Sequence, residues 1–200
     1  HQLCIPRRNR EFHNLTNRGL TTPFIFFKMA CALTGGYTLD CRDSMGGLKE
    51  VYLIELASVT SYAEVSGVVT GITKATGKQF YKFEQLPQTA HADEEATGSD
   101  ENGSFFVAQT IEIFLNKMQA SIRNQVKLLA QNRLIAVTVD RNGKAFMYGA
   151  TLGLSYNAGT GGSGTAYGDR NGYGVTLSGA EREHAFEVNA ATVALLTTPG

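Results

Sequence analysis

The chain has 200 residues, enough for one domain with a sizeable core. Its 18 Lys and Arg balance 18 Asp and Glu, and this zero net charge argues against a protein that coats nucleic acid by charge alone. The three cysteines, Cys4, Cys31 and Cys41, are too few for a disulfide scaffold and lack the second pair of a structural zinc site. Whether Cys31 and Cys41 pair stays open. No apolar run approaches the ~18 residues that cross a bilayer.

The first 28 residues differ in charge from the rest. Residues 1–28 hold five basic residues and one acidic residue, a net charge of +4, while residues 29–200 carry −4. The first methionine is Met29. A secretory signal is one interpretation of the basic start and the apolar stretch 23–27, but Lys28 interrupts that stretch. We therefore predict a non-native or disordered extension over 1–28 and a single domain over 29–200.

Alternating and β-branched residues predict strands in the first half of the domain. Residues 48–56 are apolar on both faces, as in a central strand. Residues 59–73 are rich in Val, Thr and Ile but interrupted by glycines, which suggest bends or a bulge. Residues 78–86 and 105–115 alternate between apolar and polar side chains.

One amphipathic helix is predicted at about 117–132. Met118, Ile122, Val126 and Leu129 recur at helical spacing, and Leu128 widens the stripe. The other side of the helix is polar, so it requires a sheet to pack against.

Three tetrads of similar chemistry predict tight turns at 100–103, 140–143 and 169–172. Asn142-Gly143, between strand-like runs at 134–139 and 144–148, predicts a hairpin with a type I′ turn. Further strands are expected at 173–177 and 185–188, whereas 190–196 fits either an extended segment or a helical turn. The predicted class is mainly β (α+β): an antiparallel β-sandwich or barrel with one flanking helix.

Two polar segments are predicted to form long loops. Residues 88–103 gather acids among small residues, and residues 150–168 are dominated by glycine and other small residues. Such segments bury little apolar surface alone, so we expect them to become ordered against a partner.

No arrangement of residues predicts catalysis. Four residues could coordinate a divalent cation, although a solvated loop is the simpler interpretation: His91, Asp93, Glu94 and Glu95. His184 is interpreted as a surface histidine, since no nucleophile can be placed beside it. We therefore predict no catalytic, cofactor-binding or metal-binding residues, no cofactor, and a protein that is not an enzyme.

Three stretches carry a family resemblance. They are Met29–Asp43, which reads MACALTGGYTLDCRD, Asn116–Gln119 at the start of the predicted helix, and Gly168–Glu181. In these strings the chain resembles virion structural proteins of tailed bacteriophages of the Bacteroidetes type. The order of its elements is most similar to that of a tail tube protein.

The resemblance implies an architectural role. Tail tube proteins fold as a β-sandwich or barrel with one helix and assemble as stacked hexameric rings. Edge strands of neighbouring subunits then join into an inner β-cylinder through which DNA passes without specific binding. The implied partners are other copies and other tail proteins, with no membrane. The implied location is the viral tail, after synthesis in the bacterial cytoplasm.

Other roles stay open. Within a virion the alternatives are a head–tail connector, a tail terminator or a decoration protein. From another class, a small-ligand or carbohydrate-binding β-sandwich module would also fit the predicted fold.

Overall fold

A computed structural model describes residues 35–39 and 42–200 of the chain. The chain divides into two compact units, His1–Asp43 and Ser44–Gly200. The described residues of the first unit form neither helix nor strand. The predicted extension over 1–28 and all three cysteines lie outside the described residues.

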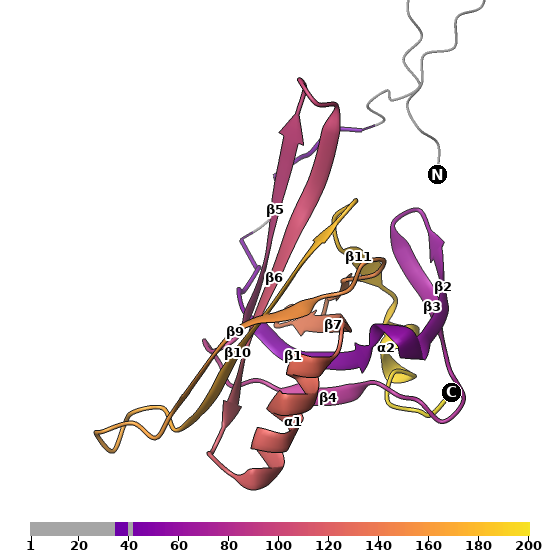
Figure 1. Ribbon diagram of the computed structural model, residues 1–200. Helices are drawn as coiled ribbons and strands as arrows, with labels where there is room; N and C mark the ends of the chain where they lie inside the picture. The colour runs from indigo at the N-terminus through magenta and orange to yellow at the C-terminus, as the bar shows by residue number, and fades with distance from the viewer. Residues whose placement is uncertain (1–34, 40–41) are drawn as a thin grey trace, which may run out of the picture. The chain divides into compact units, whose positions relative to one another are not determined.

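The second unit is built from two β-sheets (Figure 1). The seven-stranded sheet has the order β2 (Val59–Val65), β3 (Val68–Lys74), β11 (Phe186–Val188), β8 (Ala145–Tyr148), β7 (Leu134–Asp140), β1 (Leu48–Glu55) and β4 (Tyr81–Glu84). The four-stranded sheet has the order β5 (His91–Ser99), β6 (Ser104–Asn116), β10 (Gly172–Glu181) and β9 (Ser155–Gly162). The mainly β class with a flanking helix is confirmed.

The structure adds two features to that class. Both sheets are open, so neither closes into a barrel. The seven-stranded sheet is mixed, because β11 pairs parallel with β3 and antiparallel with β8. The four-stranded sheet is antiparallel throughout.

Strand β1 has buried side chains on both faces, as its sequence predicts. Val51 and Leu53 point into the core between the two sheets, where they meet residues such as Ile111 of β6. Tyr52 and Ile54 point into a second core on the opposite face of the seven-stranded sheet. Strand β1 pairs with β7 on one side and with β4 on the other.

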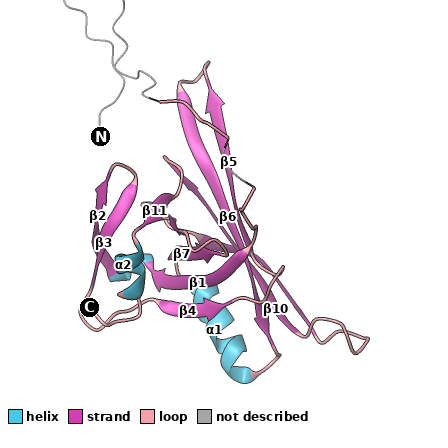
Figure 2. Cartoon of the chain, turned by 180° about the vertical axis from the view of Figure 1, so that it is seen from behind, coloured by secondary structure: helices cyan, strands magenta, loops and turns pink. Residues whose placement is uncertain are grey.

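The helix α1 (Ala120–Gln131) is shorter than predicted and less buried. Leu129 is buried in the core between the sheets, and Ile122 and Val126 are half-buried beside it. Leu128 is 52% exposed, so the prediction that it widens the buried stripe is wrong. Met118 precedes the helix and is also exposed, since the strand β6 runs on to Asn116. Figure 2 shows α1 beside the lower part of the four-stranded sheet.

The C-terminal segment covers the second core. Residues 190–196, which the sequence leaves ambiguous, begin as the short helix α2 (Ala190–Ala194), and the Asn189 side chain caps it by accepting from the Ala191 amide at 3.1 Å. Leu196 is fully buried. The Lys74 ammonium donates to the carbonyl oxygens of Leu195, Leu196 and Thr198, which holds this segment against β3.

The turns predicted at 100–103 and 140–143 are present, but the type predicted for Asn142-Gly143 is wrong. The turn predicted at 169–172 is also wrong: the chain turns at 167–168, and Gly172 already begins β10. Gly143 has a positive φ of 81° while Asn142 does not, because the Asp140 carboxylate holds the turn by accepting from the amides of Asn142 and Lys144. A type I′ turn requires positive φ at both central residues. Ser66 and Gly67, between β2 and β3, meet that requirement with φ values of 54° and 83°.

The two predicted loops each contain a strand. Residues 91–99 form β5 and residues 155–162 form β9, and each pairs along its length with one neighbour. Backbone hydrogen bonds hold an edge strand even where its side chains bury little surface, and composition does not reveal such pairing. The expectation that both segments require a partner to become ordered is therefore wrong.

Candidate assembly surface

The four-stranded sheet ends in two edges, β5 and β9. Within the part of the chain that the structure describes, neither edge pairs with a further strand. Strand β9 has no charged residue and no proline, and its residues 157–162 are exposed. Natural edge strands are commonly protected by lysines, prolines or covering elements, because bare backbone groups recruit other strands. Strand β9 lacks the first two of these protections.

Two tyrosines explain why so glycine-rich a segment forms a strand. Gly159 and Gly161 point toward the inner face of the sheet, where a Cβ at Gly159 would lie 1.6 Å from the Tyr156 hydroxyl. A Cβ at Gly161 would lie 3.0 Å from the Tyr173 ring. The rings occupy the space that side chains would fill, and so supply the packing that the glycines lack.

The outer face of this sheet is acidic and rich in hydroxyl groups. The strands β5, β6, β9 and β10 contain no lysine or arginine. Because side chains alternate between faces, His91, Asp93 and Glu95 of β5 share the outer face with Glu112 of β6. His91 lies 3.3 Å from the Asp93 carboxylate and 3.8 Å from that of Glu112. Thr110, Thr176, Ser178 and Thr160 add hydroxyl groups to this face.

The candidate acidic cluster is divided between the two faces of β5. Glu94 points inward, where its carboxylate accepts from the Gln109 side chain at 2.8 Å and from the Ala185 amide at 2.7 Å. Its second oxygen lies 3.1 Å from Nδ1 of His184. The four cluster residues therefore do not converge on one point, and His184 lies at the surface with 60% of its side chain exposed. Among the described residues, no group of three or more His, Cys, Asp or Glu side chains is placed to hold a metal ion.

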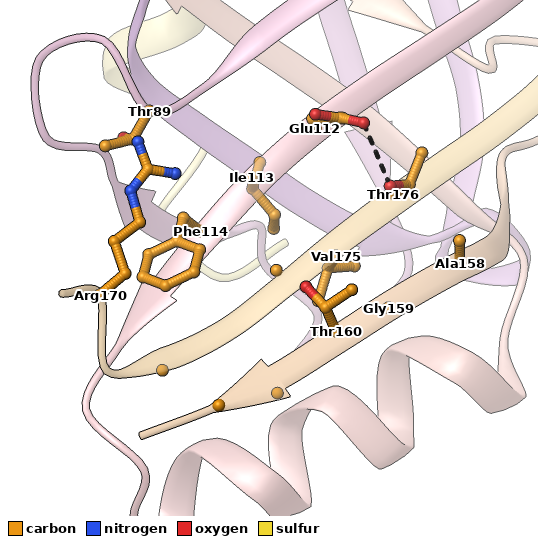
Figure 3. A pocket seen from close by; sticks show the side chains of 14 residues that line it. Thr89, Glu112, Ile113, Phe114, Ala158, Gly159, Thr160, Arg170, Val175 and Thr176 are labelled. Atoms are coloured by element: carbon orange, nitrogen blue, oxygen red, sulfur yellow. Dashed lines mark hydrogen bonds between the residues drawn. The ribbon is translucent and has the colours of Figure 1, made fainter. Parts of the chain in front are cut away.

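A shallow groove of about 460 Å³ follows the lower part of the outer face (Figure 3). Glu112 and Thr176 face each other across its upper part at 3.5 Å. Arg170 reaches in from the turn between β9 and β10, and its guanidinium lies 5.2 Å from the centre of the Phe114 ring. The rest of the lining is mainly glycine, alanine and threonine of β9 and β10, together with Thr89, Ile113 and Val175. Sequence reasoning missed this pair, because Arg170 and Phe114 are far apart in the chain and only the strand register brings them together.

The turn beneath this groove is fixed by one carboxylate. Asp169 accepts from the amides of Thr165 and Ala166 at 2.8 and 2.7 Å. These backbone hydrogen bonds, from Ala166 and then Thr165, lower the pKa of Asp169 below its ordinary value. Asp169 thus closes the turn over 165–169, which precedes the predicted turn at 169–172.

Comparison with family models, with curated proteins and with solved structures finds no match for this chain. In the described part of the chain, no helix is long and apolar enough to cross a bilayer.

Proposed function

We propose that this protein is a self-assembling structural subunit, most specifically a tail tube subunit of a bacteriophage virion. Copies join edge to edge through their four-stranded sheets, with β5 of one copy pairing with β9 of the next. The resulting closed cylinder has no exposed sheet edge. The virion and the tail tube come from the sequence resemblance; the pairing comes from the arrangement of the strands.

The observation that carries the proposal is the β9 edge, which pairs with no further strand in the described part of the chain and has no charged residue or proline to block pairing. This strand is exposed, uncharged and free of proline, while β5 at the other edge carries three acids and a histidine. Strands β5 and β9 run in opposite directions, because each step across this sheet is antiparallel. Equally oriented copies can therefore continue the same antiparallel pattern from β5 of one to β9 of the next.

The outer face of the sheet is the proposed lining of the cylinder. Its strands carry carboxylates and hydroxyl groups but no lysine or arginine. Apart from Arg170, whose guanidinium lies over the Phe114 ring, such a lining repels phosphates and leaves passing DNA unbound. The alternative of a carbohydrate-binding module has less support, since the aromatic ring of the groove, Phe114, is covered by Arg170.

The experiment blocks the β9 edge. Ala158→Glu with Thr160→Glu places two negative charges on the outer face of that strand, where both residues are exposed and would meet the acids of β5 in the next copy. The wild-type full chain is expected to form rings or tubes in negative-stain electron microscopy, and the variant to remain monomeric with an unchanged Tm. Ala57→Glu with Thr76→Glu adds the same charge at exposed positions outside the four-stranded sheet and should assemble normally.

Two results would refute the proposal. One is a wild-type chain that stays monomeric at high concentration across salt conditions. The other is a double-glutamate variant of β9 that assembles as well as the wild type.

A further inference from the structure

We propose that a basic surface around α1 binds an acidic hairpin tip of a second copy, and that this contact stacks copies along the strand direction. The basic helix surface comprises residues 117–133, and the acidic tip comprises residues 95–106 of the β5–β6 hairpin. This inference rests on the proposed self-assembly and adds to it a contact away from the sheet edges.

The acidic tip extends past the other elements of its unit in both views of the chain (Figures 1 and 2). It contains Glu95, Asp100 and Glu101 and no lysine or arginine. None of these carboxylates forms an ion pair with another described residue. Phe105 and Phe106 are 56% and 44% exposed there. Adjacent strand residues point to opposite faces, so the tip presents an aromatic ring on each side.

The basic helix surface has the opposite charge and its own exposed apolar residue. Lys117, Arg123, Lys127 and Arg133 are its only charged residues, and all four are exposed. Within the described chain none of them pairs with a carboxylate. Arg123 and Lys127 are one helical turn apart and share a flank of α1. Leu128, on the solvent side of the same helix, is 52% exposed.

These two surfaces complement each other in charge, and each carries exposed apolar side chains. Opposite charges across an interface select the partner and its orientation, while apolar contacts add affinity. Further copies of the chain supply the partner of each surface, because every copy carries both an acidic tip and a basic helix surface. A nucleic acid would neutralise only the basic helix surface and would leave the acidic tip unpaired.

The two surfaces lie at opposite ends of the four-stranded sheet. In Figures 1 and 2 the hairpin tip is at the top of the unit and α1 at the bottom. One copy therefore cannot satisfy its own charges. A contact between two different surfaces repeats from copy to copy, so it builds a stack.

The experiment reverses each surface in the full chain. Arg123→Glu with Lys127→Glu lowers the net charge of the basic helix surface from +4 to 0 and places two acids on α1, and Asp100→Lys with Glu101→Lys changes the net charge of the acidic tip from −3 to +1. Each variant alone is expected to form rings but to require at least about tenfold more protein to form tubes. An equimolar mixture of the two variants should form tubes again, since each then meets its complement. Lys49→Glu with Arg182→Glu, two exposed bases elsewhere, is the charge-matched control and should stack normally.

The outcomes separate this inference from the proposed function. Tubes that are unaffected by either reversal, or lost in both variants without recovery in the mixture, would overturn the inference and leave edge pairing intact. A wild-type chain that forms neither rings nor tubes would overturn both. Reversal of the helix charges that abolishes binding to a short DNA duplex but leaves stacking unchanged would assign the basic helix surface to nucleic acid and overturn the inference.

Discussion

The Gln109 side chain bonds to the Gly149 backbone and so joins the two sheets. Gln109 lies on β6, is 1% exposed, and accepts from the Gly149 amide at 2.9 Å. Gly149 directly follows β8 of the other sheet. The amide group of Gln109 donates in turn to Glu94, whose carboxylate also holds Ala185. This buried polar chain positions the four-stranded sheet, and hence the proposed assembly surface, over the rest of the unit.

Replacing Gln109 by leucine should destabilise the protein by about 1–3 kcal/mol, because the Gly149 amide loses its partner in a buried site. Chemical denaturation of the full chain measures the change. Gln131→Leu, at the exposed end of α1, should alter the free energy of unfolding by less than about 0.5 kcal/mol. Equal effects of the two substitutions would show that the sheets do not depend on this bond.

Gly172→Ala should destabilise the sheet strongly. A Cβ at this position would lie 2.1 Å from the Leu115 carbonyl oxygen and 3.1 Å from Cα of Asn116, and these backbone atoms cannot move aside without breaking the β6–β10 pairing. We expect a loss of about 3 kcal/mol or more, measured by thermal or denaturant unfolding. Gly162 is its register partner in β9 and has open space around it, so Gly162→Ala should be tolerated. A tolerated Gly172→Ala would contradict the strand register.

The turn between β9 and β10 should loosen in acid. Two backbone amides lower the pKa of Asp169 below its ordinary value of 3.8. The ionised carboxylate therefore stabilises the turn above pH 3.8, and this contribution disappears as the pH falls through the lower pKa of the folded state. An NMR titration should find this carboxyl group ionised below pH 3.8, and Asp169→Ala should speed amide exchange at Thr165 and Ala166 at neutral pH. A pKa at or above the ordinary value would refute this account of the turn.

Lys74→Met should release the C-terminal segment. The ammonium group donates to three carbonyl oxygens of residues 195–198, and methionine keeps the length of the side chain without any donor. We expect faster amide exchange over 192–198 and a loss of about 1–2 kcal/mol in global stability. Lys78→Met removes an exposed lysine nearby and serves as the control. Unchanged exchange in Lys74→Met would show that the burial of Leu196 and backbone bonds, such as that from the Phe80 amide to the Leu196 carbonyl, hold the segment without Lys74.

Sequence patterns predicted most strands because the spacing of apolar residues along a strand follows which of its side chains are buried. Strand β1 has two buried faces, and burial in β6 alternates strictly from Val107 to Leu115. The apolar residues of each strand follow that pattern, so each strand can be predicted from its own sequence. The helix prediction failed at Leu128 and Met118 for a related reason. Helical spacing identifies a stripe, but the width that is buried depends on what packs against it.

The candidate surface was harder to predict. Strands β5 and β9 are edges held by backbone pairing, and their acidic or glycine-rich composition is typical of loops. The rings of Tyr156 and Tyr173 that cover Gly159 and Gly161 come into place only with the register of β9 and β10. The division of the acidic cluster could have been found from the sequence, since alternation along a strand separates Glu94 from Asp93 and Glu95.

Hydrogen exchange along β9 tests the central claim, that β5 of one copy pairs with β9 of the next. Mass spectrometry of the full chain would compare amides 155–162 in the assembled wild type and in the Ala158→Glu, Thr160→Glu variant. The account predicts that assembly slows exchange in β9 and β5 together, while the Lys144–Tyr148 region, already paired on both sides, changes little. Assembled particles in which β9 exchanges as fast as in the variant would contradict it.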